Sequence, residues 1–280
     1  MADDALLLYT TEAALYDIAF SWDTSDEVDW LLGRLGDGCA PVLEPACGSG
    51  RFLVGFARRG IETIGIDISS AMVRVAQERL QAERLPGGAV VADMTEFELG
   101  RVFGGAICPI HSLAYLHGRE QLVRHLRRMA QHLRPSSRYL VQLELRDADD
   151  PWRGVRPSMW EQEQNGVRVR THWRVEQIDL ENGVELQRGT IECLAGPDEG
   201  RVFDEVHRLA AWTPARWAAA IAESPFRYVA VYDGKEEQRP LRPIGSSGRL
   251  LWHELVLDGR DGPRVGGLVL RRGRREPAFL

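Results

Sequence analysis

The spacing of apolar and polar residues divides the chain into three parts. Up to about residue 40 the apolar positions recur at helical spacing and predict two helices, over residues 4–20 and 25–35. From Pro41 onward short apolar runs alternate with helical stretches, which is typical of a parallel α/β sheet. The predicted strands cover residues 41–44, 63–67, 89–92, 105–109 and 138–145.

The helices between these strands are expected to begin near Gly50, Ser69 and Gly118. In the third helix leucine and methionine recur at helical spacing, so one of its faces should be buried. Pro135 lies just past the end of this helix, where a proline is often found.

Beyond residue 146 apolar and polar residues alternate, as they do on a half-buried strand. Asn165-Gly166 and Asn182-Gly183 predict hairpin turns, because both central residues of such a turn must reach positive φ. Residues 157–211 are therefore predicted to form a small β-insertion. A further helix should begin at Thr213-Pro214. Strand-like runs follow at residues 226–233, 250–257 and 267–270, and either of the last two can complete the main sheet.

Composition narrows the classes of function. The chain has 280 residues, 44% of them hydrophobic, which suffices for one large domain or a domain with an insertion. No apolar run approaches the roughly 18 residues of a membrane helix, and the N-terminus is acidic where a signal peptide is basic. Four scattered cysteines without a CxxC pair suit reduced thiols and make no zinc site. A cytoplasmic protein without membrane contact is expected.

The charge of the chain argues against nucleic acid as a partner. Its net charge is −6 and its pI is near 5.7, whereas a sequence-independent grip on phosphates needs positive charge. The basic segment 119–138 places its arginines on the polar face of an amphipathic helix, where a solvated surface is the simpler interpretation. Lys235 is the only lysine, so the Walker A pattern is absent.

The first predicted strand leads into Gly48-Ser49-Gly50, which must turn the chain into a helix. Glycines are needed there because a ligand lies against the backbone, where a Cβ would block it, and the helix start presents unpaired N–H groups. The pattern is an incomplete GxGxxG. Leu53 stands where dinucleotide-binding folds have the third glycine, and this departure counts against NAD as the ligand of the loop.

Two aspartates follow at the ends of the next two strands. Asp67 lies 17 residues beyond Gly50, and its two oxygens can accept both hydroxyls of a ribose. Asp93 follows the third strand and is placed to meet an adenine. With the glycine loop these residues outline a nucleoside pocket along the carboxyl edge of the sheet, where open α/β sheets bind ligands.

The order Glu44-x-x-x-Gly48-x-Gly50, Asp67 and Asp93, with 105–107 as fourth strand and 133–135 before the fifth, resembles the class I S-adenosylmethionine (SAM)-dependent methyltransferases. The resemblance covers about residues 15–145. It implies a Rossmann-like α/β fold with a mostly parallel seven-stranded sheet and helices on both faces, to which the antiparallel β-insertion is added. Residues 1–145 would form the N-terminal helices and the SAM-binding core, 146–211 the insertion, and 212–280 the C-terminal helix and last strands.

The resemblance also implies which residues hold the donor. Glu44 and the backbone of residues 46–50 would approach the methionine part of SAM, and Asp67 would bind the ribose. Asp93 would meet the amino group of adenine, between Ile68 and Met94. The expected donor contacts are Tyr16, Glu44, Ala46, Cys47, Gly48, Gly50, Asp67, Ile68, Met72, Asp93, Met94 and Cys108.

The expected reaction moves a methyl group from SAM to a nitrogen or oxygen of a small-molecule acceptor and leaves S-adenosylhomocysteine. Because the donor is already activated, alignment and exclusion of water should suffice, and no catalytic triad or metal is expected. The acceptor should lie after the fourth strand. There His111 is the candidate base for a protonated acceptor, with ordering of the loop as its alternative role. Tyr115 and Glu144 are further candidate substrate contacts.

Several features favour a small acceptor. Cys108-Pro109-Ile110-His111 differs from the Asn/Asp-Pro-Pro-Tyr/Phe tetrapeptide of methylases that act on nucleic-acid bases. The β-insertion followed by a Trp-Thr-Pro helix resembles small-molecule N- and O-methyltransferases, including those of amino sugars and glycine. Two alternatives remain: methylation of a protein or tRNA docked on the arginine helix, and a SAM-binding protein without activity. The insertion is expected to be a substrate lid or a homodimer contact.

Overall fold

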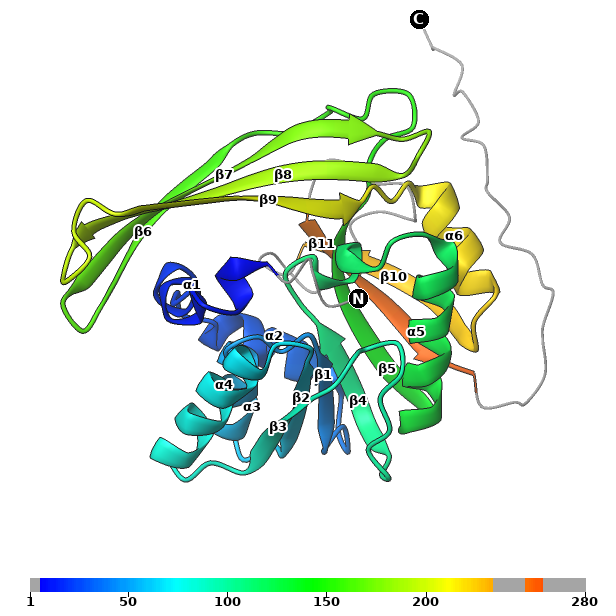
Figure 1. The fold of residues 1–280 in the computed structure, drawn as a ribbon. Helices are drawn as coiled ribbons and strands as arrows, with labels where there is room; N and C mark the ends of the chain where they lie inside the picture. The colour runs from blue at the N-terminus through cyan, green and yellow to red at the C-terminus, as the bar shows by residue number, and fades with distance from the viewer. Residues whose placement is uncertain (1–5, 234–249, 259–280) are drawn as a thin grey trace, which may run out of the picture.

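The computed structural model describes residues 6–233 and 250–258. Seven strands form the main sheet in the order β10-β11-β5-β4-β1-β2-β3 (Figure 1). The first five strands run parallel: β1 (Val42–Pro45), β2 (Thr63–Asp67), β3 (Gly87–Val91), β4 (Phe103–Cys108) and β5 (Leu133–Glu144). The predicted α/β fold class with a mostly parallel sheet is confirmed.

β11 (Leu250–Leu257) completes the sheet and pairs antiparallel with both β5 and β10 (Phe226–Tyr232). The sequence left two apolar runs that could complete the main sheet, and the run at 250–257 is the one that does so. The run at 267–270 lies outside the described residues. Most of β11 is buried, as a strand with neighbours on both sides and covered faces must be.

Helices cover both faces of the main sheet, as predicted. The helices on one face are α2 (Ser25–Leu35), α3 (Arg51–Ala57) and α4 (Ser70–Ala82), and those on the other are α5 (Arg119–His132) and α6 (Pro214–Ala222) (Figure 1). The local signals in the sequence explain where they begin. Gly50 caps α3 in the left-handed conformation, and the side chains of Ser69 and Thr213 accept backbone N–H groups at the starts of α4 and α6.

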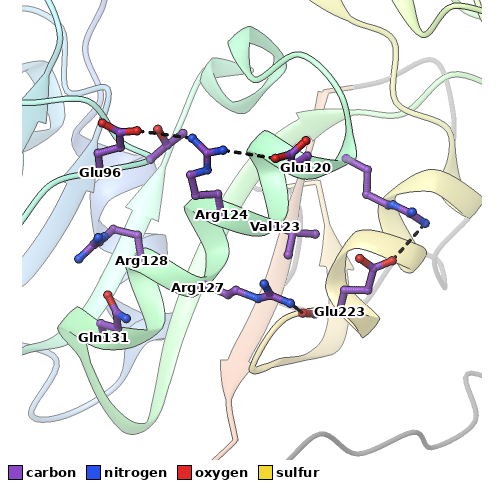
Figure 2. A pocket seen from close by; sticks show the side chains of 10 residues that line it. Glu96, Glu120, Val123, Arg124, Arg127, Arg128, Gln131 and Glu223 are labelled. Carbon is purple, nitrogen blue, oxygen red and sulfur yellow. Dashed lines mark hydrogen bonds and ion pairs between the residues drawn. The ribbon is translucent and has the colours of Figure 1, made fainter.

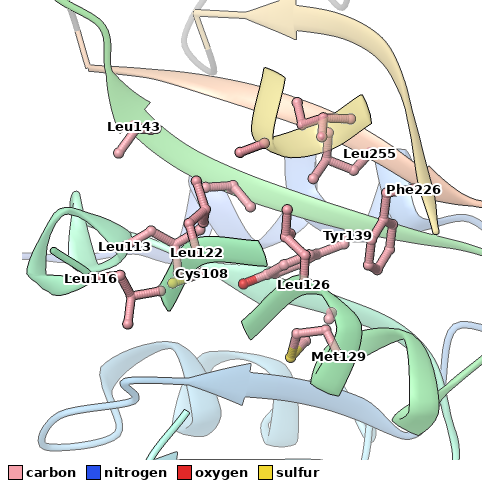
Figure 3. Close-up of a cluster of buried hydrophobic side chains, with 14 of the residues drawn as sticks. Cys108, Leu113, Leu116, Leu122, Leu126, Met129, Tyr139, Leu143, Phe226 and Leu255 are labelled. Carbon is pink, nitrogen blue, oxygen red and sulfur yellow. The ribbon is translucent and has the colours of Figure 1, made fainter. Parts of the chain in front are cut away.

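The largest apolar cluster lies between the sheet and the pair α5 and α6 (Figure 3). Leu122, Leu126 and Met129, whose spacing predicted α5, are buried there with Tyr139 and Leu143 of β5. Each such apolar side chain stabilises the fold by about 1.5–3 kcal/mol when fully buried. Packing of one amphipathic face thus fixes α5 against the sheet.

The N-terminal prediction of a single helix over residues 4–20 is wrong. The described part of this segment forms a 3₁₀ turn, η1 (Leu7–Tyr9), and then α1 (Ala13–Ala19). The break falls at Thr10, whose hydroxyl donates to the carbonyl of Leu6 at 3.1 Å. Threonine side chains compete in this way with the helical backbone, so the turn does not continue into α1.

The β-insertion forms a second, antiparallel sheet, as predicted for residues 157–211. Its strands are β6 (Ser158–Gln164), β7 (Val167–Asp179), β8 (Val184–Ala195) and β9 (Val202–Ala210). Asn165 and Gly166 both have positive φ, 54° and 77°. At the second turn only Gly183 has positive φ, 68°, so the prediction of positive φ at both Asn182 and Gly183 is wrong there. Asn182 instead donates to the Asp179 carboxylate at 2.7 Å, within a turn over residues 180–183.

The insertion lies over one end of the main sheet, with η1 and α1 beneath it (Figure 1). Leu8, Leu15 and Ala19 of this N-terminal segment are buried against Val169 and Ile191 of the insertion. None of the helices in the described part of the chain is long and apolar enough to span a membrane. The division into units at residues 145 and 211 stays a prediction.

Candidate functional site

The loop from β1 to α3 turns on three residues with positive φ: Ala46 at 54°, Gly48 at 54° and Gly50 at 79°. A Cβ on Gly50 would lie 2.7 Å from the Cβ of Ala76, so glycine is needed for the close packing of α3 on α4. Cys47 is buried in the same packing layer. A Cβ on Gly65 would lie 2.5 Å from the Cys47 Sγ, so the thiol fills the space that the absent side chain of Gly65 leaves. The small thiol supports the loop from below.

Asp67 ends β2 and lies beside this loop. Its Oδ2 accepts the N–H of Gly48 at 2.8 Å, and its Oδ1 accepts the N–H of Ser69 at 2.9 Å. Burial raises the pKa of Asp67, and these backbone N–H groups oppose that shift because they stabilise the ionised form. The carboxylate is therefore fixed in position, and each oxygen keeps a second lone pair for another donor.

Glu44 lies near the end of β1 and is 1% exposed. Among the described residues no hydrogen-bond partner meets its Oε2. Burial raises the pKa of Glu44 well above its ordinary value, and the charge of Arg51 opposes the shift. A buried carboxylate oxygen without a donor costs free energy, so this atom marks a place where a ligand donor would be favourable.

The N-terminal segment lies over the glycine loop. The ring of Tyr16 is 3.8 Å from the position that a Cβ on Gly48 would take, and it stacks on Phe20 with 4.4 Å between ring centroids. Arg51 donates from Nη1 to the Phe20 carbonyl at 2.5 Å, which ties the start of α3 to the end of α1. The structure therefore brings Tyr16 to the loop that the sequence singled out.

The residues expected around adenine lie at the ends of β2 and β3. Ile68 is 74% exposed, an apolar side chain directly after Asp67. Asp93 is exposed, and its Oδ1 accepts both the N–H and the hydroxyl of Thr95 at 2.7 Å. The Ala92 N–H donates to the Asp67 carbonyl at 2.9 Å, which joins the loop after β3 to the end of β2.

Three of the expected donor contacts are buried to different degrees. Met94 is partly buried against the main apolar cluster. Met72 and Cys108 are buried side chains, the first in α4 and the second at the end of β4. Because the Cys108 thiol belongs to the core, a donor contact at this residue would involve its backbone.

His111 precedes the 3₁₀ turn η2 (Ser112–Tyr115) and has a φ of 60°. Its Nδ1 accepts the N–H of Glu144 at 3.1 Å, so the neutral ring carries its proton on Nε2. Burial lowers the pKa of His111 to about 4. Its Nδ1 lone pair is already used by the Glu144 N–H and its Nε2 carries the proton, so the neutral ring has no free lone pair for an acceptor's proton. The geometry favours loop ordering over the expected base role.

A hydrogen-bonded chain that the sequence did not reveal joins the N-terminal segment, η2 and the insertion. The Tyr115 hydroxyl lies 2.8 Å from the Tyr9 hydroxyl and 2.8 Å from Nδ1 of His207 in β9. His207 is buried, its Nε2 has no hydrogen-bond partner among the described residues, and burial lowers its pKa to about 4. Trp173 packs against its ring, with 4.6 Å between centroids.

The carboxylate expected at the end of β5 belongs to a buried charge cluster. Glu144 accepts from Nη1 of Arg146 at 2.5 Å, and Arg146 also binds Glu185 of β8. Burial raises the pKa of Glu144, against the charge of Arg146. A signal for this cluster was present in the sequence. Glu185 and Gln187 alternate onto the same face of β8 as buried Ile191, and polar residues on an apolar face predict a buried polar cluster.

The outer face of α5 carries a separate open groove of about 990 Å³ (Figure 2). It is lined by four arginines of α5, namely Arg119, Arg124, Arg127 and Arg128. Glutamates offset this charge: Arg124 lies 3.4 Å from both Glu96 and Glu120, and Arg119 lies 3.1 Å from Glu223. None of the lining residues belongs to the glycine loop or the insertion. The paired charges support a solvated surface.

Comparison with known proteins agrees with this geometry. Residues 42–136, about a third of the chain, match the family model of a methyltransferase domain. A dTDP-3-amino-3,4,6-trideoxy-alpha-D-glucopyranose N,N-dimethyltransferase of Streptomyces venezuelae is 30% identical over 123 residues, which cover 44% of this chain and 50% of that protein. The chain therefore spans about half the length of the curated relatives it matches.

Solved structures share the fold over most of the chain. A SAM-dependent methyltransferase from Clostridium acetobutylicum has a TM-score of 0.70 at 14% identity, over 89% of this chain and 98% of that one. SAM-bound CalS10, an amino pentose methyltransferase from Micromonospora echinaspora, has a TM-score of 0.67 at 20% identity, over 92% and 99% of the two chains. With the domain match, these similarities confirm the predicted Rossmann-like fold and the resemblance to class I methyltransferases.

Proposed function

We propose that this chain, which carries a methyltransferase domain at residues 42–136, transfers a methyl group from SAM to a nitrogen or oxygen of a small-molecule acceptor. The observation that carries the proposal is the juxtaposition at the ends of β1 and β2. There the glycine loop, the fixed Asp67 carboxylate and the unpartnered Oε2 of Glu44 lie together. Relatives named as amino-sugar methyltransferases support the choice of acceptor class.

The residues of this edge fit the donor part by part. Oε2 of Glu44 is a buried acceptor for the amino group of the methionine part, which would lie along the backbone of residues 46–50 under Tyr16. The remaining lone pairs of Asp67 suit the ribose hydroxyls. Adenine would cover the exposed side chain of Ile68. Asp93, whose Oδ1 serves the turn, would use its other oxygen for the adenine amino group.

When bound, the sulfonium of SAM supplies an already activated methyl group, so the chain has to align the reactants and exclude water. The N-terminal segment is well placed for this task. The N–H groups of Leu7 and Leu8 donate to the Glu205 carboxylate of the insertion at 2.8 and 3.3 Å. The Ser69 hydroxyl donates to the Tyr9 carbonyl. The segment thus bridges the donor edge and the insertion.

We place the acceptor beside Tyr115, with His207 behind it. We assign the proton of the neutral His207 ring to Nε2, so that its Nδ1 accepts from the Tyr115 hydroxyl at 2.8 Å. An acceptor that arrives as an ammonium or a hydroxyl would pass its proton to the Tyr115 oxygen while the Tyr115 proton moves to Nδ1. In this arrangement His111 orders the loop, and Glu144 holds Arg146 at the edge of the site.

The remaining expectations about partners and location are proposals of the same kind. The four cysteines are buried and not paired with one another, which supports the reducing cytoplasm that the sequence suggested. A homodimer through the insertion stays a prediction. The offset charge on α5 supports a small acceptor over tRNA, because phosphate binding depends on uncompensated positive charge.

Two measurements test the proposal. Isothermal titration of the purified, folded chain with SAM tests donor binding, and a chain that binds no SAM would overturn the proposal. Release of S-adenosylhomocysteine from a pool of amino sugars, amines and phenols tests catalysis. SAM binding without release from any such pool would favour a SAM-binding protein that lacks activity.

A further inference from the structure

Helix α5 sends two buried histidines to the connection between β3 and β4, the segment that carries Asp93 and Met94. Nδ1 of His125 lies 2.8 Å from the Met94 carbonyl oxygen, and Nε2 of His132 lies 3.1 Å from the backbone nitrogen of Leu99. Both side chains are buried, with 0% and 1% exposure. One helix therefore holds this connection at two points.

The partners of His125 fix the direction of each hydrogen bond around it. Burial lowers the pKa of His125 to about 4, so the ring is neutral at pH 7 and carries one proton. A carbonyl only accepts, so the proton lies on Nδ1 and is donated to Met94. Nε2 then accepts from the Tyr139 hydroxyl at 2.8 Å. Tyr139 belongs to β5, so His125 joins the loop after β3 to the main sheet.

This buried hydrogen-bonded chain reaches from β5 to the loop after β3. Its two side chains, Tyr139 and His125, are both 0% exposed. A histidine at such a position costs desolvation unless both nitrogens are paired, and here both are. The same loop is joined to the donor edge by the bond from the Ala92 N–H to the Asp67 carbonyl. A shift of the loop would therefore disturb adenine and ribose contacts together.

We propose that His125 is a positioning residue for the donor: its Nδ1–H fixes the Met94 carbonyl and so sets the loop that meets adenine. The inference rests on the proposed SAM-dependent function and adds a residue that does not touch the ligand. A purely structural histidine would affect stability alone. A positioning histidine also affects donor affinity, and that effect depends on which of its two nitrogens is retained.

Two substitutions of similar size separate these roles. In His125→Asn the amide nitrogen reaches the place of Nδ1 and keeps the hydrogen bond to the Met94 carbonyl. In His125→Gln the amide nitrogen reaches the place of Nε2, and that hydrogen bond is lost. The probe is S-adenosylhomocysteine, titrated calorimetrically. We expect His125→Gln to weaken its binding about tenfold, on the scale of one lost hydrogen bond, and His125→Asn to stay within about threefold of the wild type. Both should lower the melting temperature similarly.

Two controls complete the test. His132→Asn removes the second hold, which meets the connection at Leu99, five residues beyond Met94, and should weaken binding less than His125→Gln does. Tyr139→Phe removes the partner of Nε2 and keeps the donor to Met94, so it should also keep the affinity. If His125→Gln does not fold, a tenfold loss in His125→Asn or Tyr139→Phe overturns the inference, and retained affinity in both supports it.

Hydrogen exchange of the Thr95–Phe97 amides is a second readout. It is measured on the ligand-free chain and so needs neither SAM nor S-adenosylhomocysteine. Exchange should be faster in His125→Gln than in His125→Asn. Equal affinities and equal exchange in the two variants overturn the inference. A wild type that binds no S-adenosylhomocysteine overturns the proposed function instead, and the exchange rates still decide whether His125 positions the loop.

Discussion

Arg146 and Glu185 form a two-point ion pair inside the protein, with Nε–Oε2 and Nη2–Oε1 distances of 2.6 Å and 2% exposure of each side chain. Arg146 follows β5 of the main sheet closely, and Glu185 belongs to β8 of the insertion. The backbone N–H of Arg146 also donates to the Trp212 carbonyl at 2.7 Å. A buried charge pair thus fixes the insertion to the core at the edge of the site.

Removing one partner of this pair should destabilise the fold strongly. Glu185→Ala leaves the buried Arg146 guanidinium with Glu144 as its remaining carboxylate, and breaking a buried pair in this way costs about 3–5 kcal/mol. Urea unfolding of the two proteins measures the difference. The control is Glu176→Ala, at a solvent-exposed pair with Arg188 on the same insertion, which should leave the unfolding midpoint nearly unchanged. Equal effects of the two substitutions would contradict a clamping role for Glu185.

Asp67→Ala should weaken SAM binding by about 1.5–3 kcal/mol, because it removes the charged hydrogen bonds that we propose for Asp67 with two ribose hydroxyls. The substitution also frees the N–H groups of Gly48 and Ser69, so the melting temperature must be measured beside the calorimetric affinity. An affinity within twofold of the wild type would show that the ribose assignment is wrong.

Gly50→Ala should be more destabilising than Gly60→Ala. Both glycines have φ between 75° and 79°, so each alanine suffers the left-handed conformation, which costs about 1–2 kcal/mol. Only at Gly50 does the new Cβ also meet a neighbour, the Cβ of Ala76 at 2.7 Å, while nothing lies within 4 Å at Gly60. Overpacking adds roughly 1–3 kcal/mol. Ala76→Gly should therefore partly rescue Gly50→Ala in thermal unfolding, and an absent rescue would locate the strain elsewhere.

Tyr115 and His207 should act as a unit in turnover, whereas His111 should not. General acid–base groups contribute about 10²–10⁴-fold, so Tyr115→Phe and His207→Gln should each lower kcat within that range, and the double variant should lose little more. His111→Gln should spare SAM affinity and leave the pH dependence of kcat unchanged. The assay is S-adenosylhomocysteine release with an acceptor that the wild type methylates. Additive losses, or a changed pH profile in His111→Gln alone, would return the base role to His111.

The sequence predicted those features that depend on local chemistry. The strand at Thr63–Asp67 and the starts of α3, α4 and α6 were found because glycines and capping residues act within a few positions. Gly48, Gly50 and Asp67 were found because their spacing along the chain reflects one βαβ unit. The placement of these three residues together is thus encoded almost entirely by neighbours in the sequence.

Features that depend on tertiary contact could not be predicted. The bond between Tyr115 and His207 joins residues 92 positions apart, and no local pattern marks either partner. The pKa of His111 follows from burial under the insertion, which a single sequence does not reveal. The break at Thr10 could have been suspected from two adjacent threonines, but the docking of η1 on Ser69 and Glu205 could not.

Buried histidines should make the fold sensitive to acid. Burial lowers the pKa of His125 and of His253 to about 4, from an ordinary value near 6.5. Between these values the unfolded chain binds more protons than the folded one. The stability that each neutral histidine contributes is therefore complete above about pH 6.5 and is lost as the pH falls towards 4. Within this window each histidine can lower the free energy of unfolding by up to about 1.4 kcal/mol for each pH unit.

His253→Gln isolates one such contribution, because Gln keeps a donor to the Leu143 carbonyl, which Nε2 of His253 approaches at 3.1 Å, and does not titrate. Between pH 7 and pH 5 we expect the unfolding free energy of the variant to fall less steeply than that of the wild type. The difference in slope should be at most that of one bound proton, about 1.4 kcal/mol per pH unit. Burial raises the pKa of Glu44, so Glu44 changes the stability with pH in the opposite direction to the buried histidines. Because Glu44 is present in both proteins, its effect cancels, and the difference between the two slopes reports on His253. Urea unfolding at several pH values measures both slopes, and parallel slopes would show that His253 is not held neutral by burial.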